Sequence, residues 1–365
     1  MVDMGAQTRP DRRLLLGLTS MLAGVVAMAL GIVLLVRADA TPERIEVMAG
    51  LATEPGRGER AAAAATTRVL AISVDGLNPH ALGELGKERA PHLLRLFRQG
   101  AGTRNARSQV EQTVTLPNHT SMVTGRRIDA DHNGHGVTWN HDAPGTTVHE
   151  AAGEDVSSVF REVDAAGGST AFFATESKFS VWERSWPVAI DRSVIRQDGD
   201  AAVTRLARRD LVGKSREFTF LHLGVADETG HAHGWMSEKY LSAIETVDGL
   251  VGSVLRTIKK TESLAGLVVV LTADHGGPPG GTHHDDPQLL ANYRVPFVIW
   301  GPGVTKGDLY EMNEDGYADP GDERVKFKGT QPVRNGDLAN LALDILGIGK
   351  VPQSRWNRKQ TLAWN

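Results

Sequence analysis

The sequence predicts an α/β domain in which a mostly parallel central sheet carries helices on both faces. Short apolar runs rich in Val, Ile and Leu recur along the chain, and such runs are typical of buried strands in parallel sheets. Segments with a helical pattern separate them, as this architecture requires. Acidic and histidine residues directly follow several of the runs. Because open α/β sheets bind ligands at the carboxyl ends of their strands, this placement predicts a functional site.

The expected strands begin where the globular part of the chain begins, near Arg68. Each is short, apolar and bounded by turn residues or by the charged residues that follow it. The predicted strands cover residues 69–74, 170–173, 218–225, 267–271 and 295–300. The last of these stops at Gly301-Pro302-Gly303.

The expected helices lie between these strands or after the last one. Residues 90–97 have Pro91 near the start, where a helix tolerates proline. Residues 156–166 form a second helix, which Gly167-Gly168 closes. Residues 238–258 form a long helix with an apolar face, and residues 338–346 form a terminal helix.

The amino-terminal region is expected to lie outside this domain. Residues 14–36 contain no charged residue and are long enough to cross a bilayer, while secretory signal peptides have shorter apolar segments. We therefore expect an uncleaved signal anchor, and a cleaved signal peptide remains the alternative because Ala38 and Ala40 suit cleavage. The predicted organisation is a cytoplasmic tail (1–13), a transmembrane signal anchor (14–36), a flexible linker (37–67) and the α/β domain (68–365).

This organisation predicts a single-pass protein of the cell membrane with an extracytoplasmic α/β domain, or a secreted protein if the signal is cleaved. The 365-residue chain has a formal net charge of -4 and no long basic stretch, so we expect no nucleic-acid binding. It contains no cysteine, which excludes disulfides and thiolate metal sites. Any metal must therefore be held by nitrogen and oxygen ligands.

Metal-ligand residue types gather at the predicted strand ends. Asp75 follows the first strand, and Asp274 and His275 follow the strand at 267–271. Asp227 and His231 follow the strand at 218–225, and their four-residue spacing lets both reach one ion. With a later histidine, the set provides three carboxylates and three imidazoles. That count suits two Zn²⁺ ions with open coordination positions.

Four motifs in order resemble those of a known family. They are Val74-Asp75-Gly76, Thr115-Leu116-Pro117-Asn118-His119, Asp227-Glu228-Thr229-Gly230-His231 and Asp274-His275-Gly276-Gly277. Over residues 68–346 the chain resembles the alkaline phosphatase superfamily, most closely its type I phosphodiesterase/nucleotide pyrophosphatase family. The resemblance implies a three-layer, alkaline-phosphatase-like sandwich.

The resemblance also implies roles for individual residues. Asp75, Asp274 and His275 would hold one zinc, which would also touch Thr115, the nucleophile. Asp227 and His231 would hold the second zinc together with His283 or His284, of which His284 fits the local pattern better. Asn140 would hydrogen-bond a phosphoryl oxygen, while His119 and His233 would have supporting or packing roles. The alternatives are a helix N-cap for Thr115 and a turn residue for Asn140.

The implied reaction is hydrolysis of a phosphodiester or pyrophosphate bond through a phosphothreonine intermediate. The substrate would be a small phosphate ester or pyrophosphate, such as a nucleotide or a lipid head group. A phosphomonoesterase is the alternative, with Lys178 and Arg184 as the candidate cations for a terminal phosphate. A membrane-tethered binding protein on the same scaffold is the third possibility.

Overall fold

The structure, a computed structural model, describes residues 66–365. The expected cytoplasmic tail, the signal anchor and nearly all of the linker lie outside the described residues, so these parts of the prediction stay predictions. Within residues 66–365, no helix is both long and apolar enough to cross a membrane.

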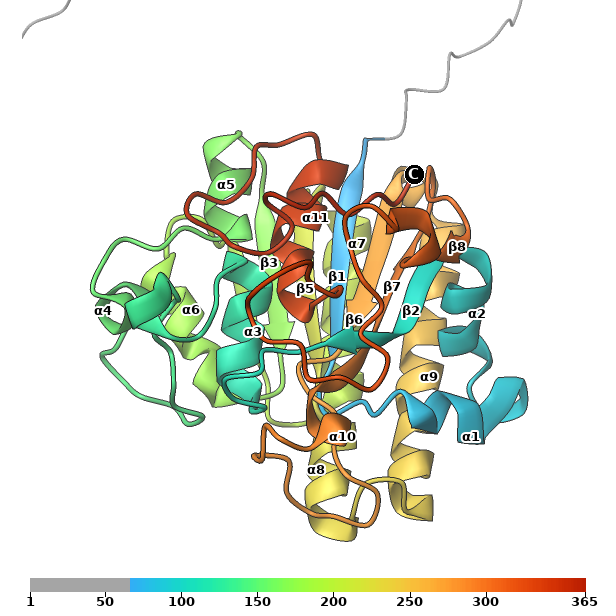
Figure 1. The fold of residues 1–365 in the computed structure, drawn as a ribbon. Coiled ribbons are helices and arrows are strands. Elements are labelled where there is room, and N and C mark those ends of the chain that lie inside the picture. The colour runs from blue at the N-terminus through green and yellow to red at the C-terminus, as the bar shows by residue number, and fades with distance from the viewer. Residues whose placement is uncertain (1–65) are drawn as a thin grey trace, which may run out of the picture. The chain divides into compact units, whose positions relative to one another are not determined.

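A single sheet of eight strands runs through the described part of the chain (Figure 1). Its order is β4-β3-β5-β1-β6-β7-β2-β8, with β1 parallel to both β5 and β6 and with β7 antiparallel to both β6 and β2. The strands are β1 (Arg68–Val74), β2 (Ala101–Arg107), β3 (Thr170–Ala174), β4 (Arg192–Ile195), β5 (Phe218–Leu223), β6 (Leu267–Thr272), β7 (Arg294–Trp300) and β8 (Gly307–Asp308).

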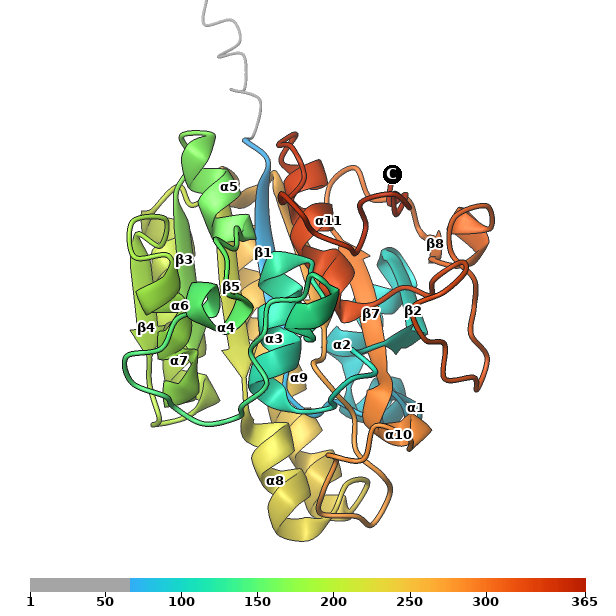
Figure 2. The same cartoon turned by 60° about the vertical axis from the view of Figure 1, so that its left-hand side comes forward.

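Helices cover both faces of the sheet, which confirms the predicted fold class. Helices α3, α5 and α11 pack together on one face, while α2, α7 and α9 cover the other (Figures 1 and 2). The α-helices are α1 (His80–Arg89), α2 (Pro91–Gln99), α3 (Thr115–Thr124), α4 (Val148–Ala152), α5 (Val159–Ala165), α6 (Ser180–Ser185), α7 (Asp200–Gly213), α8 (Val225–His233), α9 (Glu238–Lys260), α10 (Leu290–Tyr293) and α11 (Leu338–Ile345).

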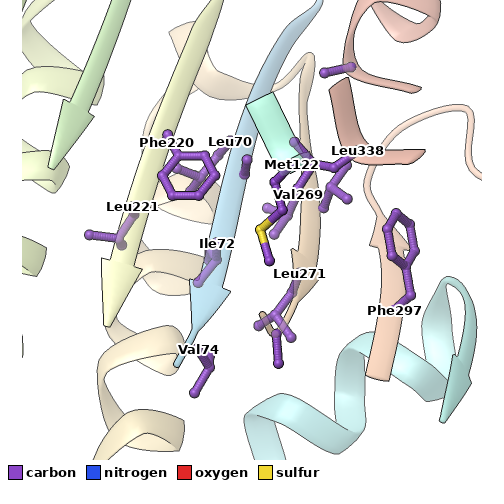
Figure 3. Close-up of a cluster of buried hydrophobic side chains, with 14 of the residues drawn as sticks. Leu70, Ile72, Val74, Met122, Phe220, Leu221, Val269, Leu271, Phe297 and Leu338 are labelled. Atoms are coloured by element: carbon purple, nitrogen blue, oxygen red, sulfur yellow. The ribbon is translucent and has the colours of Figure 1, made fainter. Parts of the chain in front are cut away.

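The centre of the sheet is the most deeply buried part of the domain. Every residue of β1, β5 and β6 is buried, because each of these strands has a neighbour on both sides and a helical layer on both faces. Apolar side chains from these strands pack near Met122 of α3 and Leu338 of α11 (Figure 3). The carboxyl ends of the three parallel strands therefore lie side by side on a rigid support.

Most expected elements differ from the structure by one or two residues at an end, and two differences affect the interpretation. The strand expected at 218–225 ends at Leu223, and α8 begins at Val225. Asp227 and His231 thus lie one turn apart on a helix, and their separation in the sequence places both on one helical face. The helix expected from residue 156 begins at Val159, because Ser158 caps it by accepting the Arg161 N–H.

Candidate metal centre

Three carboxylates and one imidazole meet at the carboxyl ends of β1, β5 and β6. Nε2 of His275 lies 3.3 Å from Oδ1 of Asp75 and 3.1 Å from Oδ2 of Asp274. It also lies 3.7 Å from Oδ1 of Asp227, which is in the first turn of α8. All four residues are buried. Residues that are 200 positions apart in the chain thus form one cluster, because each follows a neighbouring strand.

Two further histidines extend the cluster beyond Asp227. Nε2 of His231 lies 3.4 Å from Oδ2 of Asp227, and Nε2 of His284 lies 3.5 Å from Oδ1 of the same residue. The two Nε2 atoms are 3.1 Å apart. His284 is buried in the cluster, whereas His283 is exposed. The geometry therefore favours His284 over His283.

Backbone carbonyls orient the three histidines in the same way. Nδ1 of His275 bonds to the Gly276 carbonyl (2.8 Å), and Nδ1 of His231 bonds to the Thr282 carbonyl (2.8 Å). Nδ1 of His284 bonds to the carbonyl of Thr113 at 2.6 Å. A carbonyl accepts only, so each Nδ1 carries the proton and each Nε2 faces the carboxylates. This arrangement is typical of histidines that bind metal through Nε2.

The cluster contains buried polar atoms with no hydrogen-bond partner. They are Oδ1 of Asp75, Oδ1 of Asp227, Oδ2 of Asp274 and Nε2 of His275. Burying such atoms unpaired is costly, and buried charges are normally paired or coordinate a metal. Among the described residues, three sets of possible ligand atoms lie within 4.8 Å of one another, and two of them, Asp75/Asp227/His275 and Asp227/His231/His284, consist of residues of this cluster. These nitrogen and oxygen donors fit a pair of divalent cations such as Zn²⁺.

Mutual repulsion and burial strongly perturb the ionisation of the cluster. Burial and the charge of Asp75 raise the pKa of Asp227 to about 8, and the same two causes raise that of Asp274 well above its usual range. Burial opposes the charged form of Asp75 too, but the hydrogen bond from His222 and the close approach of His275 hold its pKa well below the usual range. Burial and nearby His275 lower the pKa of His284 to about 2, so His284 is neutral, as a metal ligand must be.

Thr115 lies at the amino end of α3, beside this cluster. Val114 is the N-cap residue and no side chain caps the helix, so Thr115 is not the N-cap. The Thr115 carbonyl accepts a hydrogen bond from Nδ1 of His119 (2.9 Å), and Nε2 of that ring bonds to the Ser73 hydroxyl on β1 (2.8 Å). Nδ1 of His119 is also 3.5 Å from Oδ2 of Asp274. His119 thus ties the first turn of α3 to the sheet and to the cluster.

Asn140 is held next to Thr115. Its Oδ1 accepts the backbone N–H of Leu116, the residue after Thr115, at 2.9 Å. Because the carbonyl oxygen of the side chain is used in this bond, the amide N–H groups remain as donors. Asn140 is exposed, so these donors are accessible from solvent.

The remaining candidates lie apart from the cluster or are already paired. Nζ of Lys178 forms an ion pair with Glu176 at 2.5 Å. Arg184 donates to the carbonyls of Thr146 and Ala143 and so holds that loop to α6. His233 is exposed at the end of α8.

Sequence reasoning missed His222, which contacts the cluster directly. Its Nε2 donates to Oδ2 of Asp75 at 2.9 Å from within β5. A histidine inside a fully buried apolar strand is itself a signal, because such a side chain needs a polar partner.

Comparison with known proteins supports the fold. The chain has the fold of solved alkaline-phosphatase-like proteins. Murine ectonucleotide pyrophosphatase/phosphodiesterase 5, solved as an inactive threonine-to-alanine variant with AMP, aligns with a TM-score of 0.60 at 15% identity, covering 81% of this chain and 99% of that one. An alkaline phosphatase superfamily protein from Vibrio parahaemolyticus aligns with a TM-score of 0.56 at 15% identity, over 82% of this chain and 71% of that one.

The sequence defines the family more closely. Residues 69–292 match the family model of type I phosphodiesterase/nucleotide pyrophosphatase, so the chain belongs to this family, as the motifs predict. Similar curated proteins are named GPI ethanolamine phosphate transferase 1. The Chaetomium globosum protein is 36% identical in an alignment that covers 42% of this chain and 17% of that protein. The Mus musculus protein is 24% identical in an alignment that covers 77% of this chain and 31% of that protein. The chain thus spans less than a third of the length of these relatives.

Proposed function

We propose that the protein cleaves phosphodiester or pyrophosphate bonds of small substrates, with Thr115 as the nucleophile and two Zn²⁺ ions as cofactors. The observation that carries the proposal is the convergence of unpaired buried ligand atoms from Asp75, Asp227, Asp274 and His275 near the start of α3. Membership of the phosphodiesterase family supports the same reaction class.

The ligand atoms divide between two proposed sites. Asp75, Asp274 and His275 would hold one ion, and Asp227, His231 and His284 would hold the other. Asp227 also lies close enough to His275 to stand between the two sites. When bound, zinc ions supply Lewis acidity and lower the pKa of bound groups, which activates a hydroxyl that is otherwise a poor nucleophile.

The protein's own groups position the reacting atoms. Attack by Oγ1 of Thr115 would form a bond to phosphorus while the bond to the leaving oxygen breaks, giving a phosphothreonine. Water would then hydrolyse this ester and restore the hydroxyl. The side-chain amide N–H groups of Asn140 are suited to hydrogen-bond a phosphoryl oxygen.

Group transfer is the second candidate, because the similar curated proteins are named as ethanolamine phosphate transferases. The phosphothreonine step would be the same, but a hydroxyl group of a second substrate would replace water. A lipid head group would then be the donor. Phosphomonoester hydrolysis ranks lower, because Arg184 is engaged with backbone carbonyls and Lys178 with Glu176.

The test uses the full chain in detergent, loaded with zinc. We expect a higher kcat/KM for a bis-aryl phosphate diester than for the corresponding aryl monoester, and loss of activity in a chelator. Preference for the monoester would favour the phosphatase alternative, with Lys178 the first residue to replace. Product analysis with a phosphoethanolamine lipid and an added alcohol would separate transfer from hydrolysis, since only transfer gives a new phosphodiester. A chain that binds no zinc and stays inert would contradict the enzyme proposal.

We also propose that the catalytic domain is extracytoplasmic and anchored through residues 14–36, with secretion after cleavage as the alternative. The support is the uncharged amino-terminal stretch. Fractionation of cells expressing the full chain, with protease added outside, tests both outcomes.

A further inference from the structure

We infer that His222 is a positioning residue that holds Asp75 so that a single carboxylate oxygen faces the metal centre. The inference rests on the proposed metal centre and adds to it a residue from the interior of the sheet. His222 is fully buried in β5, where it lies opposite Ser73 of β1 in the strand register.

The two oxygens of Asp75 have different environments. Oδ2 accepts a hydrogen bond from Nε2 of His222 at 2.9 Å. Oδ1 has no hydrogen-bond partner and lies 3.3 Å from Nε2 of His275. With Oδ2 engaged, Oδ1 is the oxygen left for a cation. His222 therefore fixes both the rotation of the carboxylate and which of its oxygens binds.

The far side of the His222 ring is fixed as well. Nδ1 lies 3.0 Å from the hydroxyl of Thr175 and 3.5 Å from its backbone N–H. A backbone N–H only donates, so Nδ1 is a hydrogen-bond acceptor. Nε2 therefore carries the proton and donates the hydrogen bond to Asp75. Thr175 thus selects the tautomer that can act on the carboxylate.

Packing leaves the ring little freedom to turn. The His222 ring contacts Phe179 and His119, with ring centroids 4.7 Å and 5.0 Å away. Glu176, the other carboxylate nearby, is 3.8 Å from Nε2 and is paired with Lys178. Asp75 is accordingly the closer acceptor, and no solvent reaches the contact to replace it.

A direct metal-ligand role for His222 is the competing explanation. Ligand atoms of Asp75, His119 and His222 do approach within 4.8 Å of one another. However, both nitrogens of His222 are already in hydrogen bonds, and both nitrogens of His119 contact Ser73 or Thr115. Binding a third cation there would break several of these bonds, so the positioning role fits better.

The test measures zinc affinity and stoichiometry of the full chain by competition with a chromophoric chelator. His222→Leu removes the donor, while His222→Gln keeps an N–H that can reach Asp75. Thr175→Val removes the hydroxyl that selects the tautomer. The matched control is His135→Gln, because His135 is another buried histidine whose ring bonds to a side-chain hydroxyl, that of Ser121, but it does not contact the cluster.

We expect His222→Leu to weaken zinc binding roughly 10- to 100-fold, the range seen for groups that orient metal ligands, with the number of ions unchanged. Thr175→Val should lose less zinc affinity than His222→Leu, and His222→Gln should retain part of the affinity that His222→Leu loses. His135→Gln should bind zinc with wild-type affinity. Thermal unfolding of the metal-free proteins shows whether each variant folds. If His222→Leu does not fold, the single variants Thr175→Val and His222→Gln provide the test.

Wild-type affinity in both His222 variants would overturn the inference while leaving the proposed metal centre intact. Loss of one bound ion in His222→Leu would also overturn it, because His222 would then be a ligand. Absence of zinc binding in the wild type would instead contradict the proposed function itself.

Discussion

Two reciprocal hydrogen bonds join His284 and Thr113. Nδ1 of His284 donates to the Thr113 carbonyl at 2.6 Å, and the Thr113 hydroxyl donates to the His284 carbonyl at 2.5 Å. Thr113 lies two residues before Thr115, and His284 lies in the cluster of candidate ligands. The pair therefore joins the segment that carries the proposed nucleophile to the loop that carries a proposed ligand.

Thr113→Val should loosen this connection without removing a ligand or the nucleophile. The buried His284 carbonyl loses its donor, which costs about 1–3 kcal/mol of folding free energy. We expect zinc affinity and kcat to fall together. Thr170→Val is a matched control, because the buried Thr170 hydroxyl also donates to a distant backbone carbonyl, that of Ala189. If both variants lost stability but kept wild-type kcat and zinc affinity, the connection would have no functional role.

Thr115→Ala should separate metal binding from turnover. The ligand side chains are intact in this variant, so zinc content should be nearly unchanged, while kcat should fall at least roughly 1,000-fold because the nucleophile is missing. Thr115→Ser should retain part of the activity. Thr124→Ala, a buried threonine at the other end of the same helix, is the control. Full activity in Thr115→Ala would rule out a phosphothreonine intermediate.

Zinc removal should destabilise the domain, because the carboxylates of Asp75, Asp227 and Asp274 are then buried together without a cation. Free zinc at 100 times its Kd stabilises the folded state by about 2.7 kcal/mol per site. Asp274→Asn removes a ligand and one source of repulsion. We therefore expect metal-free Asp274→Asn to unfold at or above the temperature at which the metal-free wild type unfolds. Adding zinc should raise its unfolding temperature less than that of the wild type. Scanning calorimetry with zinc or chelator measures both, and an undiminished zinc gain in Asp274→Asn would show that Asp274 is not a ligand.

The sequence was sufficient to predict the elements with a clear hydrophobic pattern. The buried strands β1 and β6 and the long amphipathic helix α9 lie within a few residues of their predicted limits, because burial on both faces of a strand or one face of a helix leaves a visible period. Strand β2 was missed, since its residues Arg104 and Asn105 break any apolar run. The antiparallel direction of β7 was missed too, because strand direction depends on chain connections rather than on local pattern.

In the candidate site, too, residues with a local sequence pattern could be predicted and long-range contacts could not. Asp75, Asp274 and His275 could be proposed from the sequence because they directly follow apolar strands. The partners of His222 and Thr113 could not be predicted, because these contacts join segments 147 and 171 residues apart. Such contacts follow from the strand order and from the path of the loop before α10, neither of which has a local sequence signal.

A buried acid that is not one of the candidate metal ligands gives a prediction for pH. Burial raises the pKa of Asp337 to about 7, although the Arg334 backbone N–H, at 2.7 Å, favours the charged form. The folded state therefore binds this proton more tightly than the unfolded chain, whose aspartates titrate near about 3.9. The resulting stability is fully present below the unfolded pKa and is lost as pH rises from about 4 through 7. By linkage the loss amounts to about 4 kcal/mol at most.

Asp337→Asn cannot titrate, so it should remove this part of the pH dependence. We expect its stability relative to the wild type to increase between pH 5 and pH 8, as measured by urea unfolding of the metal-free proteins. Asp164→Asn, on the exposed side of α5, should run parallel to the wild type. Both variants share the titrating carboxylates of the metal cluster with the wild type, so the difference isolates Asp337. Parallel curves for wild type and Asp337→Asn would mean that Asp337 is ionised in the folded protein throughout this range.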